Sequence, residues 1–162
     1  MNAGFRNGPH ARVTTQGEDA TELRFGPEFD APSASYRALA YHEVAEVLRM
    51  REEIVRKEGV PPEKLYPPVD RENQRFHTAR KHAHRFDNIK KSEACAAIRR
   101  TITTETDARG EPRFHPFEVA QIMNLMPEDA EEARGLIPSL QKKVDLDDDV
   151  LNHLLSAIRA LV

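Results

Sequence analysis

The sequence predicts an all-α protein with one short extended segment before its first helix. Apolar residues recur at helical spacing in six segments along the 162 residues. Only residues 23–25 alternate apolar and polar side chains as a strand does. Glycines and prolines stand near the ends of these segments, where they stop or start regular structure.

The composition limits the class of protein. The chain carries 24 Lys and Arg against 27 Asp and Glu, so it is not built mainly to coat nucleic acid or a membrane. Its single cysteine, Cys95, cannot form an internal disulfide, and no apolar run is long enough to span a membrane. Leu, Ile, Val and Phe make up only 36 of the 162 residues. We therefore expect an intracellular, soluble protein that is partly disordered or partly stabilised by another protein.

The N-terminal region is expected to bind a partner. Residues 1–22 are polar and aperiodic, which predicts a disordered tail. Residues 23–32 are expected to be extended, and a lone strand at 23–25 needs the edge of another chain's sheet. The candidate contacts are Leu23, Phe25, Pro27 and Phe29. The alternative is an extended tether packed on the protein's own helices.

A long first helix is predicted over residues 33–58, capped by Ser33 or Ser35 and ended by Gly59. Its apolar positions cover about half of the helix circumference, which is broad for one packing face. The helix therefore either has two packing surfaces, one for a partner, or is generously buried in its own fold. The candidate partner contacts are Val44, Val47 and Leu48. Residues 59–69 contain four prolines and predict a linker.

Five more helices are predicted within residues 70–162. They are expected at 71–86 after Asp70, at 93–104 after Ser92, from Pro116, from Pro127, and at 148–161 after Ser139 or Asp147. Cys95 lies in an alanine-rich helix and is expected to be a small core residue. The acidic start of the Pro127 helix matches the helix dipole, or it is a contact surface for other factors.

No pattern of catalytic residues is found. The seven glycines are scattered and form no phosphate loop, and the sequence contains no nucleophile elbow. His77 and His84 share a helix face but lie about 10 Å apart along the axis, so they cannot share a metal ion. We therefore expect no enzymatic activity, no catalytic residue, no metal site and no cofactor.

The segment 71–91 is basic, with seven Arg and Lys against two acids. Arg75, Arg80, Lys81 and Arg85 are candidates for a face that contacts nucleic acid phosphates or an acidic partner. The acidic stretch 128–149 of the same chain is one such partner, and a simple solvated face is another interpretation. No aromatic residue interleaves the basic positions as base stacking requires. This favours a solvated face, or pairing with the acidic stretch 128–149, over contact with nucleic acid.

A family resemblance rests on two stretches of sequence. One is Leu23-Arg24-Phe25-Gly26-Pro27-Glu28-Phe29, and the other runs from Phe114-His115-Pro116-Phe117-Glu118 through Asn124-Leu125 to Pro127–Leu140. The chain resembles, over about residues 18–162, the fourth subunits of eukaryotic RNA polymerase II. The archaeal polymerase counterpart and the polymerase III counterpart are more distant members of this group.

The resemblance implies an HRDC-like helical bundle over residues 70–162. It also implies a non-catalytic nuclear subunit, with or without shuttling to the cytoplasm, that pairs with the polymerase's seventh subunit. The pair forms a stalk near the RNA exit channel, supports initiation and couples transcription to RNA processing. Nascent RNA is contacted mainly through the partner, with no membrane and no small-molecule substrate involved. The alternatives are the same position in RNA polymerase III and a stand-alone HRDC-like nucleic-acid-binding module.

Overall fold

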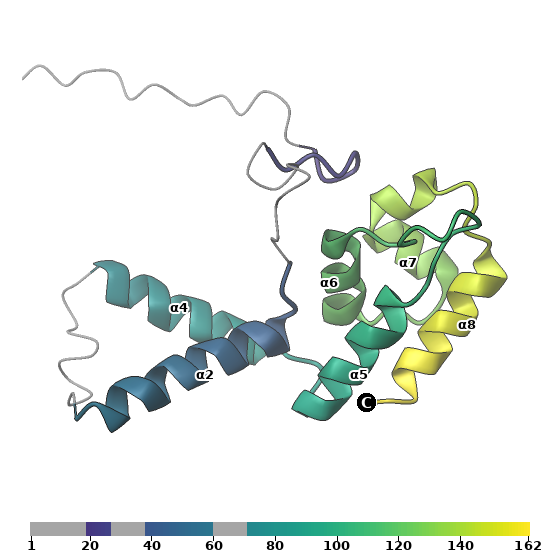
Figure 1. Cartoon of the computed structure of the whole chain (residues 1–162). Helices are drawn as coiled ribbons and strands as arrows, with labels where there is room; N and C mark the ends of the chain where they lie inside the picture. The colour runs from purple at the N-terminus through teal and green to yellow at the C-terminus, as the bar shows by residue number, and fades with distance from the viewer. Residues whose placement is uncertain (1–18, 27–37, 60–70) are drawn as a thin grey trace, which may run out of the picture.

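The computed structural model describes residues 19–26, 38–59 and 71–162, and its regular structure is helical (Figure 1). The elements are α2 (Tyr41–Lys57), α4 (Arg71–Phe86), α5 (Ser92–Thr103), α6 (Pro116–Leu125), α7 (Ala130–Leu136), the 3-10 helix η1 (Pro138–Lys142) and α8 (Asp148–Arg159). Within the described ranges only isolated β-bridges occur, and no helix is long and apolar enough to cross a membrane. The predicted all-α fold is therefore confirmed.

Figure 1 shows two groups of helices. Helices α2 and α4 lie side by side and project as an arm, while α5, α6, α7, η1 and α8 form a bundle. Helix α5 contacts α2 as well as α6 and α8, so it joins the arm to the bundle. We use "the arm" and "the bundle" in this sense below.

The bundle is held together by aliphatic side chains. The largest fully buried residues include Ile98, Ile102, Ile122, Met123, Leu140, Leu151, Leu155 and Ile158. Cys95 is 3% exposed and belongs to the same cluster, which confirms its predicted role in the core. The last helix is shorter than the predicted range 148–161, since α8 ends at Arg159 and Leu161 beyond it is exposed.

Helix α2 begins later than predicted. Residues 38–40 precede it, and Ala40 occupies the N-cap position. The carboxylate of Glu43 accepts the backbone N–H of Ala40 at 2.8 Å, which fixes the start of the helix. The predicted caps Ser33 and Ser35 lie outside the described residues. The C-terminal end of the helix agrees with the prediction that Gly59 ends it, since Gly59 adopts a positive φ of 75° just after the helix.

The other helices lie close to their predicted positions, with different caps at two of them. Lys91, not Ser92, occupies the N-cap position of α5, without a side-chain capping bond, and the Ser92 hydroxyl bonds to His42. Helix α7 begins at Ala130 rather than at Pro127, because the Asp129 side chain accepts the N–H of Glu132 at 2.8 Å. Residues 60–70, which include the predicted linker and the predicted cap Asp70, lie outside the described residues.

The predicted strand at 23–25 is wrong. Asp19 and Arg24 exchange two backbone hydrogen bonds of 2.8 and 2.9 Å, and the chain between them turns. Leu23 has a φ of 54°, which is incompatible with an extended strand. Three alternating residues were too short a pattern to outweigh this local turn. Of the predicted tail, residues 1–18 lie outside the described residues, whereas Asp19 to Glu22 belong to the turn.

A candidate protein-docking site

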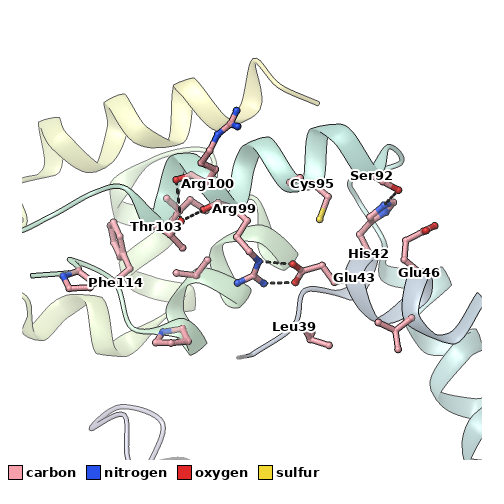
Figure 2. Close-up of a pocket in the computed structure, with 16 residues that line it drawn as sticks. Leu39, His42, Glu43, Glu46, Ser92, Cys95, Arg99, Arg100, Thr103 and Phe114 are labelled. Atoms are coloured by element: carbon pink, nitrogen blue, oxygen red, sulfur yellow. Dashed lines mark hydrogen bonds and ion pairs between the residues drawn. The ribbon is translucent and has the colours of Figure 1, made fainter. Parts of the chain in front are cut away.

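An open groove lies between α2, α5 and the loop that precedes α6 (Figure 2). Its volume is about 960 Å³. The apolar residues along it are Leu39, Val47, Cys95, Ala96, Ile102, Pro112, Phe114, Pro116 and Val119. A concave and mainly apolar surface of this size is a place where a second molecule can bury its own apolar side chains.

A buried ion pair forms one side of the groove. Arg99 on α5 is 6% exposed, and its Nε donates to Glu43 on α2 at 2.6 Å. Its Nη2 donates to the other oxygen of the same carboxylate (Figure 2). The same Nη2 donates to the carbonyl of Ala38 at 3.0 Å. The pair thus fixes residues 38–43 against α5 and shapes the groove between the two helices. Neither residue was predicted to belong to a site, although Arg99 lies one turn after the core residue Cys95.

A second polar cluster joins α2 to the loop between α4 and α5. His42 is buried, its Nδ1 lies 2.9 Å from Asp87 Oδ2, and its Nε2 lies 3.2 Å from the Ser92 hydroxyl. Asp87 also accepts the backbone N–H of Ile89 at 2.9 Å and so shapes the loop. The residue types and their order match a serine hydrolase triad. In this fold the cluster holds the start of α2 in place.

Helix α2 has two apolar faces, as its broad stripe predicted. Leu48 and Val55 are half-buried on the side that faces α4, and Val44 lines a depression between the two helices. Val47, Met50 and Ile54 are 54%, 52% and 56% exposed. They follow one another at spacings of three and four residues, so they form one stripe, which we call the α2 stripe. The stripe adjoins the groove, because Val47 belongs to the stripe and also lines the groove.

This arrangement separates the predicted partner contacts. Of Val44, Val47 and Leu48, only Val47 lies on the exposed stripe. Met50 was missed, although its position three residues after Val47 and four before Ile54 was a sufficient signal. Pro27 and Phe29 lie outside the described residues.

Phe25 packs on its own chain. Its ring lies 4.7 Å from that of Phe117 and 5.6 Å from that of His115, measured between ring centroids. These two residues begin α6, where His115 Nδ1 accepts the N–H of Phe117 at 3.2 Å. Glu22 in the same turn pairs with Lys142 of η1. The segment 19–26 is therefore packed on the bundle, as the tether alternative expected, but it forms a turn and is not extended.

The predicted basic positions divide into two groups. Arg80, Lys81 and Arg85 line one shallow depression on α4, together with His77 and His84. Arg75 lines a different depression, between α2 and α4. The arrangement therefore brings together three of the four predicted residues and adds two histidines to them.

The outer edge of the arm carries paired charges. Arg49 lies 3.0 Å from Glu46 and 3.5 Å from Glu53, both on α2. The hydrogen bond from Arg49 lowers the pKa of Glu46, and the same bond raises the pKa of Arg49. Both groups stay ionised at neutral pH, so this edge has little net charge next to the α2 stripe.

Comparisons with known proteins agree with one another. Residues 38–162 match the family described as RNA polymerase Rpb4. The chain is 33% identical over 144 residues to the DNA-directed RNA polymerase II subunit rpb4 of Schizosaccharomyces pombe, covering 89% of this chain and 91% of that protein. It is 30% identical over 151 residues to the subunit of the same name from Dictyostelium discoideum, covering 89% and 88%. The matched range includes the arm, the groove and the bundle.

Proposed function

The chain belongs to the RNA polymerase Rpb4 family, and we propose that it is a non-catalytic subunit of nuclear RNA polymerase II. In this role it pairs with the polymerase's seventh subunit, and the pair forms the stalk beside the RNA exit channel. There it supports initiation and the coupling of transcription to RNA processing. The names of its relatives support the polymerase, and the α2 stripe supports the existence of a protein partner.

The exposed apolar surface of the arm is the observation that carries this proposal. A helix that served only its own fold would present polar residues on the side away from α4. Helix α2 instead exposes Val47, Met50 and Ile54 there, next to a mainly apolar groove. Exposed apolar patches of this kind mark protein interaction sites, and methionine is enriched at interfaces. The stripe and the groove together are thus the proposed docking surface.

The N-terminal segment adds to the docking surface through side chains. Arg24 already pairs its backbone with Asp19, so it does not need the edge of a partner's sheet. Phe25 anchors the turn on the bundle through its ring, and half-buried Leu23 in the same turn is the proposed contact. Pro27 and Phe29 stay candidate contacts on the grounds of the sequence alone. Val44 and Leu48 contribute indirectly, by holding α2 against α4.

The test compares two double variants of the full chain, each co-expressed with the seventh subunit. Val47→Glu with Met50→Glu places two charges on the α2 stripe. Val144→Glu with Val150→Glu is the matched control, because both residues are exposed on the bundle, away from the groove. Burying a large apolar side chain is worth roughly 1.5 kcal/mol or more, so the first variant should weaken the heterodimer roughly 100-fold. The control should bind as the wild type does.

Thermal unfolding of each variant alone separates binding from folding. All four positions are exposed, so their melting temperatures should stay near that of the wild type. Equal binding of the stripe variant and the wild type would show that the α2 stripe is not the interface.

A further inference from the structure

We propose that the outward face of α4 binds the phosphate backbone of nucleic acid without reading its sequence. The face consists of His77, Lys81, His84 and Arg85, which line one shallow depression of about 450 Å³. At 100° per residue these positions lie on the side of the helix away from Ala83, which is 1% exposed. The face therefore points away from α2 and into solvent.

Two cations of this face are not compensated by any acid in the described part of the chain. Within the described ranges, neither Lys81 nor Arg85 forms an ion pair with a carboxylate. Arg80, at the edge of the face, is held 3.0 Å from Glu52 of α2. On the far side of α2, Arg49 is likewise paired, as described above. Lys81 and Arg85 thus give the outward face of α4 a local positive charge, although the whole chain has a net charge of −3.

The chemistry of the depression fits a polyanion better than a folded protein. Its lining consists of histidine, arginine and lysine side chains, with no aliphatic, Phe, Tyr or Trp anchor. Protein interfaces place such anchors at their centre, and the α2 stripe offers them whereas this face does not. A lysine, an arginine and the imidazole N–H of His84 are donors that suit phosphate oxygens.

The spacing and the lining residues define the kind of binding. Positions 77 and 85 lie about 12 Å apart along the helix, which is enough to follow more than one phosphate of a strand. No Phe, Tyr or Trp side chain lines the depression, so it has no large stacking platform for a run of bases, and the positive charges dominate the contact. Binding is therefore directed at phosphates, independent of sequence and sensitive to salt. The α2 stripe lies on the other helix of the arm, so a protein partner and a nucleic acid can bind at the same time.

The test is fluorescence anisotropy of the full chain with a labelled 20-nucleotide RNA of mixed sequence and with a DNA duplex of equal length. If two cations contact a single strand, the logarithm of the binding constant should fall with the logarithm of the salt concentration with a slope of about −1.4. Affinity should therefore fall about sevenfold between 50 and 200 mM salt. Lys81→Glu with Arg85→Glu should weaken binding at least tenfold at 50 mM salt. The neutral pair Lys81→Gln with Arg85→Gln should give a smaller loss in the same direction.

A control with the same change in net charge is available elsewhere on the chain. Lys57→Glu with Arg109→Glu alters two exposed cations, at the end of α2 and in the loop before α6. It should change affinity less than twofold. An equal loss in this control, or full binding by the α4 variants, would overturn the proposal. So would displacement of the RNA by polyglutamate at equal charge concentration, which would assign the face to an acidic protein. Unchanged melting temperatures of the α4 variants are expected, because both side chains are exposed.

Discussion

Replacement of Arg99 by methionine should destabilise the protein severely. Arg99 is 6% exposed and makes three hydrogen bonds, two to the Glu43 carboxylate and one to the carbonyl of Ala38. Methionine fills a similar volume but offers no donor. The change therefore leaves a largely buried carboxylate and a carbonyl without their main partner, and it releases the start of α2 from α5.

The magnitude follows from the burial of both partners. The Arg99 and Glu43 side chains are 8% and 18% exposed in the ion pair. Removing one partner of a buried pair costs about 3–5 kcal/mol, because the other charge stays buried. Glu43 keeps the bond from the N–H of Ala40, so we expect the lower end of this range, about 3 kcal/mol. Replacing both residues, Arg99→Met with Glu43→Leu, should recover part of the loss.

Urea unfolding followed by circular dichroism measures the effect. The free energy of unfolding of a protein of this size falls by about 1.5–2 kcal/mol per molar urea. A loss of about 3 kcal/mol of stability therefore lowers the unfolding midpoint by roughly 1.5–2 M urea. Arg100→Met is the matched control, since the next residue of α5 is exposed, and it should shift stability by less than about 0.5 kcal/mol. A midpoint that moves no further for Arg99→Met than for Arg100→Met would refute the claim that this ion pair organises the groove.

Three further perturbations test other parts of the structure. The pKa of Asp107 is lowered from 3.8 because its carboxylate accepts the backbone N–H groups of Glu111 and Arg109. The ionised carboxylate therefore stabilises that turn above pH 3.8, and this stabilisation is lost as the pH falls through the lowered pKa. The amide resonance of Arg109, whose N–H donates to the Asp107 carboxylate at 2.8 Å, should titrate below pH 3.8 in the wild type and stay constant in Asp107→Asn. Glu118 is fully buried and lies 3.1 Å from Lys143, so Glu118→Gln should cost about 2 kcal/mol in urea unfolding, whereas an unchanged midpoint would show that the charge is dispensable. His42→Ala should cost about 2 kcal/mol by the same assay, because we interpret the cluster of His42 with Asp87 and Ser92 as structural. For the same reason a fluorophosphonate should not label the wild type, and labelling would contradict that interpretation.

The sequence predicted those elements in which one periodic pattern dominates. The ranges of α4, α5, α6 and α8 follow from apolar spacing with a proline or a capping side chain nearby, and the two faces of α2 follow from the width of its stripe. The short N-terminal pattern failed because a turn at Asp19 to Arg24 satisfies the backbone locally. Periodicity could not detect that turn, since hydrogen bonds between near neighbours leave no repeat in the sequence.

The candidate site was only partly predictable for a different reason. Val47 was found because it is apolar, but apolar type alone could not tell it from Val44, which lies on the other side of the same helix. Arg99 and His42 were missed because charged and polar residues are usually read as exposed. Their burial depends on partners more than 40 residues away, Glu43 and Asp87, and such pairings are set by the tertiary fold.

Purification of the tagged full chain from its native cells, followed by mass spectrometry, shows which polymerase the chain belongs to. We expect the seventh subunit and the large subunits of RNA polymerase II to be recovered together with the chain. Recovery of polymerase III subunits instead would move the protein to the other enzyme and contradict the assignment. Recovery of neither polymerase would contradict the proposed function as a whole.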